Sequence, residues 1–515
     1  MNRFLAFDFG AESGRAHVGT LLGDKVSIEE IHRFPNEPVE VCGTLHWDVL
    51  SLYSNLLKGM KEYVARFGDT VDGVGIDTWG NDFGLLDSDG KLLQNPVHYR
   101  DRRVEGMVEL MRQEIAPEDL FQHTGMPLSP VNTSVQLFAL RSHPSPLLKH
   151  ADTLLMMPDL FNYFLTGRKI GERTDASSSQ LYDPCRRRWS EEVFSRLDLP
   201  VNIMPPLTDP ATVVGELCTS VQRSVGIKRG IVLAPCTHDT ASAVAAAPGL
   251  NQDWAFISSG TWSVVGALSS EVLTSAGAFR AGVCNELTLG NFFLCHNIMG
   301  LWLLQQLRRA WQRHGATYSN DSLIQLAKKV SVHGPLINPN DPSFYAPEDI
   351  LAAIRAFCVR TQQTPPQQPG EIARCILESL ALCYRRQLDD VAHLLQRRFR
   401  VLHIVGGGAR NSLLCQLTAD ATGLPVVAGP VEATVMGNLL AQAMARGYLT
   451  SCDQVRQVAC ASSDLVGYEP TGSNVWPDRY AKYLQVVNAS QQVRANEQNA
   501  DGGCTKENSW LGAWA

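Results

Sequence analysis

Two glycine turns, centred on Gly10 and Gly260, carry residue types that could hold a polyphosphate. The first turn lies in residues 8–15, with the sequence DFGAESGR, and the second lies in residues 257–263, with the sequence ISSGTWS. In each, an apolar run enters a turn of small residues, so backbone N–H groups can approach an anion closely. Two such turns facing each other would hold the phosphates of a nucleotide between two domains.

The first turn also carries side chains that suit phosphate chemistry. Ser13 can donate a hydrogen bond to a phosphate oxygen, and Arg15 can neutralise phosphate charge. Asp8 would repel phosphate unless a metal lies between them, which makes Asp8 a candidate ligand of Mg²⁺ or of a water molecule bound to it. The structural alternative is an ordinary hairpin turn with a capping aspartate, since such turns are common.

The second turn and a later glycine triad could complete a nucleotide site. The second turn offers hydroxyls and N–H groups without a carboxylate, which suits terminal phosphates. The triad, residues 406–408, follows a buried strand-like run, and three glycines allow a flat ring or a ribose to lie against the backbone. Each segment also fits a tight turn without a ligand.

Asp239 is the candidate general base. It ends a strand-like run and opens a helix of small residues, and its carboxylate could accept the proton of an attacking sugar hydroxyl. An aspartate that caps a helix is the structural alternative. His238 beside it could bond a sugar or simply be packed. Aromatic, amide and charged groups that suit a polyol occur at residues 78–82 and 99–102 and in a helix expected over 297–311, which Asn297 opens and which contains Trp302 and Gln305.

An α/β scaffold has to position these residues. Short apolar runs predict strands, and a helical period of apolar residues predicts helices between them. Strands are expected at residues 4–9, 15–20, 71–77, 231–234, 254–258, 263–268, 401–405 and 426–428, and helices at 47–67, 158–165, 240–247, 322–330, 371–395 and 433–445. Residues 201–230 have a loop-like texture. The domain boundary is expected near residue 245, giving domains 1–245 and 246–467 and a C-terminal extension 468–515, poorly ordered after Tyr483.

Composition excludes several classes of function. The 515 residues exceed one ordinary domain. The formal charge of -7 argues against a nucleic-acid surface. The apolar run at the N-terminus is interrupted by Asp8, and no 18-residue apolar stretch exists, so neither a signal peptide nor a membrane span is expected. P-loop and Rossmann fingerprints are absent from the sequence.

The cysteines indicate a cytoplasmic protein. There are 13, an odd number, without a CxxC pair, which is typical of reduced thiols rather than of disulfides or a zinc site. Cys358 and Cys375 flank a proline-rich loop that could bring two helix ends together. Two free buried thiols are the expected state of that pair.

Taken together, the motifs resemble the FGGY carbohydrate kinases, within the actin-like ATPase superfamily. They occur in the family's order over roughly residues 4–445. The segments that carry the resemblance are residues 8–15, 75–80, 98–101, 237–244, 258–263, 297–305 and 403–408. One departure concerns Glu12, where relatives often have a small hydroxyl residue, and we expect the Glu12 side chain to face outward.

The resemblance implies two actin-like, ribonuclease H-like domains with a nucleotide cleft between them. It also implies an ATP-dependent sugar kinase that works with Mg²⁺ and transfers the γ-phosphoryl group to the 1-hydroxyl of L-rhamnulose, in L-rhamnose catabolism. Asp239 matches the family's catalytic base. The positions that match ATP contacts are Ala11, Glu12, Ser13, Gly14, Arg15, Thr261, Gln305 and Gly407. The positions that match sugar contacts are Gly80, His238, Asp239, Thr240 and Asn297.

Three alternatives stay open at this point. The first is a related ketose kinase for L-fuculose or xylulose, the second is a non-catalytic sugar-responsive regulator, and the third is a chaperone-type or filament ATPase. The expected partners are ATP and a ketose, without nucleic acid or membrane, in a monomer or small homo-oligomer.

Overall fold

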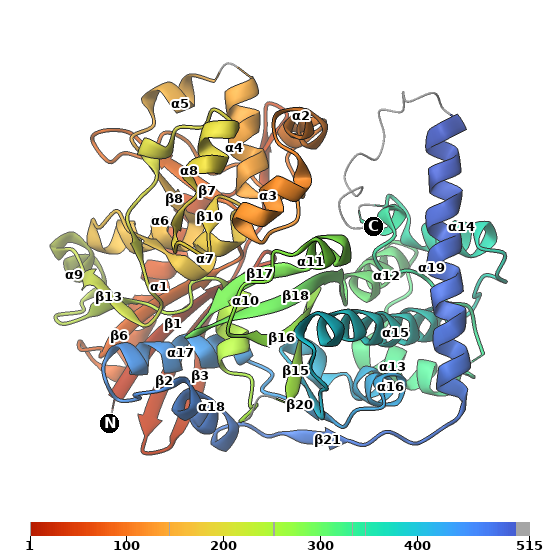
Figure 1. Cartoon of the computed structure of the whole chain (residues 1–515). Helices are drawn as coiled ribbons and strands as arrows, with labels where there is room; N and C mark the ends of the chain where they lie inside the picture. The colour runs from red at the N-terminus through yellow and green to blue at the C-terminus, as the bar shows by residue number, and fades with distance from the viewer. Residues whose placement is uncertain (1, 144, 251–252, 332, 346, 501–515) are drawn as a thin grey trace. The chain divides into compact units, whose positions relative to one another are not determined.

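The computed structural model describes residues 2–143, 145–250, 253–331, 333–345 and 347–500. The chain divides into two compact units, each built around strands of its own (Figure 1). Unit 1 comprises Met1–Leu250, Leu268–Leu294 and Glu432–Ser463; unit 2 comprises Asn251–Ala267, Cys295–Val431 and Asp464–Ala515. Each unit therefore contains segments that are far apart in the sequence.

Unit 1 contains a six-stranded sheet of order β13-β14-β6-β1-β2-β3. The strands β1 and β2 form an antiparallel hairpin, while β6 pairs in parallel with β1 on one side and with β14 on the other. The strands run over Asn2–Phe9 (β1), Ser13–Leu22 (β2), Lys25–Pro35 (β3), Gly73–Thr78 (β6), Thr212–Glu216 (β13) and Ile231–Ala234 (β14). The strands predicted from the first half of the sequence are confirmed.

Helices α1 (Val49–Phe67) and α17 (Ala433–Ala445) cover opposite faces of this sheet. A Cβ atom on Gly59 of α1 would lie 2.9 Å from the Phe7 ring, and one on Gly19 of β2 would lie 2.6 Å from Leu439 of α17. Gly19 is opposite Phe4 in the hairpin register. Because successive residues of a strand point to opposite faces, Phe4 and Phe7 cannot share a face.

The remaining elements of unit 1 are short helices and strand pairs. They include α10, which begins at Asp239, and β17, which contributes Glu286 to the site described below. Their bounds are Val39–Val41 (β4), Thr44–His46 (β5), Phe83–Leu86 (β7), Met107–Glu114 (α2), Pro117–Thr124 (α3), Thr133–Ser142 (α4), Pro146–His150 (α5), Thr153–Met156 (β8), Met157–Thr166 (α6), Gly171–Glu172 (β9), Arg173–Ser178 (α7), Tyr182–Asp183 (β10), Arg188–Trp189 (β11), Glu191–Arg196 (α8), Leu207–Thr208 (β12), Thr219–Val225 (α9), Asp239–Ala245 (α10), Ala276–Ala281 (α11), Cys284–Thr288 (β17) and Cys452–Ala461 (α18).

Unit 2 repeats the plan of a hairpin followed by parallel strands. Its strands are ordered β16-β15-β19-β20-β21, and β15 pairs antiparallel with β16 but in parallel with β19, which pairs in parallel with β20. The strands run over Trp254–Ser259 (β15), Trp262–Ser269 (β16), Asn291–Met299 (β18), Val401–Val405 (β19), Val426–Ala428 (β20) and Val466–Tyr468 (β21). The helices run over Trp302–Arg313 (α12), Asn320–Lys328 (α13), Ile350–Arg360 (α14), Pro369–Leu395 (α15), Ser412–Thr422 (α16) and Val475–Ala500 (α19).

Three stretches differ from the sequence-based expectation. Asn297 was expected to open a helix, but it lies in β18, and the helix α12 begins only at Trp302. The loop-like stretch 201–230 contains β12, β13 and α9. The chain after Tyr483 continues as α19 to Ala500, where Val486 and Val487 are buried, while 501–515 lie outside the described residues.

Among the helices of the described ranges, none combines the length and the apolar run that crossing a bilayer requires.

Candidate active site

The first glycine turn closes the β1–β2 hairpin of unit 1. The Gly10 N–H donates to the Ser13 carbonyl at 3.1 Å. Asn36 braces the turn from outside, since its side-chain amide donates to the Gly10 carbonyl at 2.9 Å and its backbone N–H donates to the Glu12 carbonyl at 3.1 Å. The Glu12 residue is exposed, as its departure from the family pattern led us to expect. Ala11 and Ser13 are half-buried at the tip.

Gly14 and Arg15 have structural partners within the same unit. A Cβ atom on Gly14 would lie 2.2 Å from the Phe34 ring, so packing alone already requires glycine there. The Arg15 guanidinium bonds the Asp8 carboxylate and lies 2.6 Å from the Glu432 carboxylate. Arg15 therefore balances two carboxylates of this unit, and its predicted contact with phosphate stays a prediction.

Asp8 and Asp77 are neighbours in the parallel register of β1 and β6. Both are buried, and burial raises the pKa of Asp8 while Arg15 acts in the opposite direction. Burial and the nearby Asp8 raise the pKa of Asp77 well above its ordinary value. Asn438 of α17 donates to one Asp77 oxygen, and the other oxygen is buried without a hydrogen-bond partner. Oxygen atoms of this kind suit a hard divalent cation or the water bound to it.

Asp239 is the first residue of α10 and keeps 32% of its side chain exposed. The Thr240 hydroxyl and backbone N–H both donate to its Oδ1. Desolvation raises the pKa of Asp239, while the adjacent His238 lowers it. A carboxylate with a raised pKa that still meets solvent is a suitable general base.

Gly80 is buried and closely packed against side chains near this base. A Cβ atom there would lie 2.8 Å from the Ser178 hydroxyl and 3.3 Å from both Asp175 Oδ1 and His238 Nε2. Asp175 is fully buried, its Oδ2 has no hydrogen-bond partner, and burial raises its pKa to about 8. Packing therefore already requires glycine here, and the side chains around it carry groups that can exchange hydrogen bonds with a polyol.

Two carboxylates in this part of unit 1 were missed from the sequence. Glu286 of β17 lies 3.0 Å from His238 Nδ1, and Asp175 of α7 lies next to Gly80. The local signal for Glu286 is an acidic residue in a strand-like run with Val283 and Leu287, because an acid in a buried strand requires a partner.

The segments of unit 1 proposed to grip a polyol are mostly inside the protein. The Asp82 carboxylate accepts from the indole N–H groups of Trp47 and Trp79 at 2.6 and 2.9 Å, and from Gln136 at 3.0 Å. Burial raises its pKa to about 6. The ring of His98 stacks on Trp47 at 4.2 Å. These side chains therefore serve the internal packing of unit 1.

In unit 2, the second glycine turn closes the β15–β16 hairpin and lies at the start of α12. The Thr261 carbonyl accepts from the N–H groups of Gly300 and Trp302, and Gln305 Nε2 lies 3.5 Å from the Thr261 hydroxyl. The structure therefore brings Thr261 and Gln305 together, while Asn297 is half-buried on β18, just before α12.

The glycine triad after β19 is split in its roles. Cβ atoms on Gly406 and Gly408 would lie 3.0 and 2.0 Å from atoms of Ser259, so these two glycines serve packing. A Cβ atom on Gly407 would meet nothing within 4 Å, and the residue is exposed. Gly407 is thus the member of the triad that is open to a ligand.

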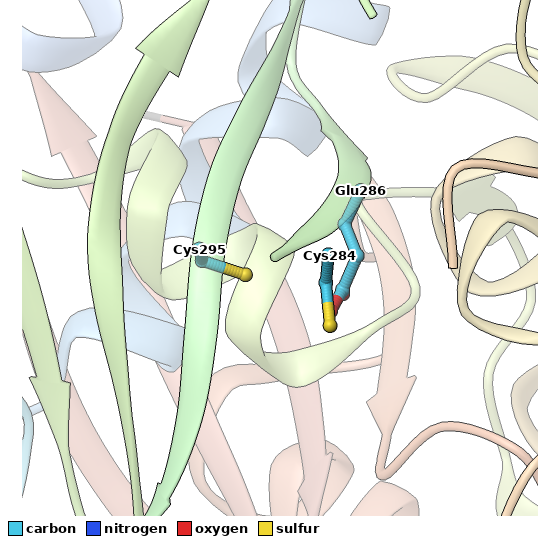
Figure 2. Close-up of side chains that lie close together, drawn as sticks. All are labelled: Cys284, Glu286 and Cys295. Carbon is cyan, nitrogen blue, oxygen red and sulfur yellow. The ribbon is translucent and has the colours of Figure 1, made fainter. Parts of the chain in front are cut away.

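The thiols of the described residues are free. Cys358 and Cys375 are both buried free thiols, as expected. Figure 2 shows Cys284 and Glu286 close together on β17 of unit 1. Because a structural zinc site takes four ligands and Glu286 already pairs with His238, we interpret this group as packing.

Comparison with known proteins gives a consistent result along the chain. Residues 3–246 match the model of the N-terminal domain of the FGGY family of carbohydrate kinases, and residues 255–446 match that of its C-terminal domain. The chain is 39% identical over 485 residues to a rhamnulokinase of Bacteroides thetaiotaomicron, covering 94% of this chain and 99% of that one. It is 38% identical to a rhamnulokinase of Enterococcus faecalis, covering 94% and 97%.

Solved structures agree at the level of the fold. A ligand-bound xylulose kinase of Lactobacillus acidophilus superimposes with a TM-score of 0.78 at 14% identity, covering 97% of this chain and 99% of that one. A glycerol kinase of Plasmodium falciparum with ADP superimposes with a TM-score of 0.77 at 16% identity, covering 96% and 98%. The similarity supports two actin-like domains.

Proposed function

We propose, from the premise that the chain belongs to the FGGY family of carbohydrate kinases, that this ATP-dependent kinase phosphorylates L-rhamnulose. The γ-phosphoryl group of ATP passes to the 1-hydroxyl of the ketose, giving L-rhamnulose 1-phosphate and ADP, as a step of L-rhamnose catabolism. The observation that carries the sugar assignment is the similarity to rhamnulokinases along nearly the whole chain.

Asp239 acts as the general base of the transfer. It orients the sugar hydroxyl and takes its proton while the oxygen forms a bond to the γ-phosphorus and the bond from that phosphorus to the ADP oxygen breaks. Phosphoryl transfer needs alignment and charge stabilisation more than covalent help from the protein. The partly exposed Asp239 carboxylate, held by Thr240, supports this role.

Asp8 fits the role of holding Mg²⁺ through a water molecule. The buried Asp8 carboxylate and the unpartnered oxygen of Asp77 beside it supply hard oxygen atoms. When bound, the ion neutralises phosphate charge. Arg15, which also pairs with Glu432, holds the Asp8 carboxylate in place.

The other site residues divide by ligand, and the nucleotide cleft implied by the family resemblance is part of the proposal. The residues assigned to ATP are Ala11, Glu12, Ser13, Gly14, Arg15, Thr261, Gln305 and Gly407. The residues assigned to the sugar are Gly80, His238, Asp239, Thr240 and Asn297. The division into domains 1–245 and 246–467 with an extension 468–515 belongs to the same proposal, as does a monomer or small homo-oligomer in the cytoplasm, which the free thiols support.

A ketose panel tests the proposal. ADP release would be measured with ATP and Mg²⁺ on L-rhamnulose, L-fuculose and xylulose, with a reaction lacking ketose as control. We expect kcat/KM for L-rhamnulose to exceed the others by about tenfold or more, because a site that bonds specific hydroxyls rejects misplaced ones. A preference for L-fuculose or xylulose would instead assign the chain to that neighbouring activity.

A further inference from the structure

We propose that Glu286 is a positioning residue that holds His238 as an imidazolium, paired through Nδ1 with Glu286 and lying through Nε2 beside Asp239 and Gly80. The inference rests on the proposed function for the identity of the substrate, but the pairing itself is a property of unit 1 alone.

The geometry gives each ring nitrogen of His238 a carboxylate. Nδ1 lies 3.0 Å from Glu286 Oε2, and Nε2 lies 3.5 Å from Asp239 Oδ1. A neutral imidazole has only one N–H, so it could donate to one of these carboxylates but not to both. Neither contact meets hydrogen-bond geometry, but both are within ion-pair distance, and only the imidazolium places a positive charge between the two carboxylates.

The strand that carries Glu286 is anchored to the helices of the site. The Leu287 N–H donates to the Ser177 hydroxyl of α7 at 3.0 Å, and the Thr288 hydroxyl donates to the Ala241 carbonyl of α10 at 2.7 Å. Figure 2 shows Glu286 extending from β17. Because α10 also carries Asp239, these bonds hold Glu286 and Asp239 in a fixed position relative to each other.

The groups around His238 favour its charged form. The titratable groups facing it are Glu286 from β17, Asp175 from α7 and Asp239 from its own segment, while Ser178 and Thr78 nearby are neutral. Burial lowers the pKa of His238, but Glu286 and then the two aspartates outweigh it and raise that pKa to about 9. In return the cation lowers the pKa of Asp239 and keeps more of the base ionised at neutral pH.

This arrangement sets the direction of a pH effect. A group whose pKa is raised keeps its proton at neutral pH and loses it as the pH rises through the raised value. The interaction with ketose should therefore persist to about pH 9 and weaken above it. Without the Glu286 carboxylate the pKa of His238 falls. The decline of kcat/KM for ketose on the alkaline side of its pH profile, its alkaline limb, then moves to lower pH.

The experiment compares Glu286→Gln and Glu286→Asp with Thr288→Val as the matched control, since the last change removes an anchor of the same strand without touching His238. kcat/KM for ketose would be followed from pH 5.5 to 10. We expect Glu286→Gln to move the alkaline limb down by roughly 1–3 pH units, the usual effect of a neighbouring opposite charge. Glu286→Asp should restore part of the shift, and Thr288→Val should leave the limb in place. A limb that is unchanged in Glu286→Gln overturns the proposal.

A second readout separates this inference from the proposed function. ¹³C-histidine NMR of the ligand-free protein, with the His238 signal assigned through His238→Gln, gives the pKa of the ring without any substrate. A parent value well above the ordinary 6.5 that falls in Glu286→Gln supports the pairing even if no ketose is phosphorylated. A parent value at or below 6.5 overturns it, even if Glu286→Gln fails to fold.

Discussion

Gly80 shows what a single residue does at this site. Because it has no side chain, Ser178, Asp175 and His238 can pack closely against it. We predict that Gly80→Ala raises the KM for ketose by about tenfold or more while the KM for ATP stays within about twofold, because the added methyl group would displace Ser178, Asp175 or His238, and a site that bonds hydroxyls depends on where its partners lie. Steady-state kinetics with each substrate varied would measure it.

The control is Gly467→Ala, where a Cβ atom would meet nothing within 4 Å. It should leave both Michaelis constants unchanged. If Gly80→Ala raised the KM for ketose and the KM for ATP equally, the change would disturb more than the residues assigned to the sugar.

For single residues, the sequence allowed us to predict site residues that lie within motifs, but not the side chains that they contact in the fold. Asp239, His238 and Gly80 could be named from local patterns, and the structure places them together. Glu286 could not, because its role depends on a contact with a residue 48 positions earlier, which no local pattern records. Arg15 was expected to meet phosphate, yet its bonds to Asp8 and Glu432 could only be seen in the fold.

Among the elements, α17 packs closely against α10. A Cβ atom on Gly437 of α17 would lie 1.9 Å from the Ser242 carbonyl oxygen of α10, whose first residue is Asp239. We predict that Gly437→Ala destabilises the protein by about 1–3 kcal/mol or more, the usual cost of overpacking, and also lowers kcat. Urea unfolding and kinetics would measure the two effects. If Gly437→Ala unfolded at the same urea concentration as the parent protein, the close contact between Gly437 and Ser242 would be contradicted.

Helices and strands were predicted well where the periodicity of apolar residues and the positions of turn residues indicated the same element. The strands on either side of both glycine turns and the long helix α15 follow such patterns. Asn297 was misplaced because Trp302 and Gln305 do lie on a helix, and the pattern was extended backwards across Gly300, which the structure shows to be outside it. The tail after Tyr483 was judged by its polar composition, but Val486 and Val487 bury one side of α19.

For the molecule as a whole, binding of the nucleotide should be visible as stabilisation. A ligand at 100 times its dissociation constant stabilises the folded state by about 2.7 kcal/mol. We predict that ADP with Mg²⁺ raises the melting temperature and that EDTA removes most of this increase. Gly407→Leu should melt like the parent without ligand, since the position is open, but should lose the increase. An increase retained by Gly407→Leu would remove Gly407 from the nucleotide site.

The central claim is that Asp239 takes the proton of the ketose hydroxyl as it attacks ATP, and the turnover of Asp239→Asn tests it most directly. Asp89→Asn is the matched control, because that aspartate is exposed and paired with Lys91. Turnover would be measured at saturating ATP and ketose, and ATP affinity by equilibrium binding. We predict that Asp239→Asn lowers turnover by about a hundredfold or more with ATP affinity nearly unchanged, while Asp89→Asn behaves like the parent. An Asp239→Asn protein that turns over within tenfold of the parent would contradict the account.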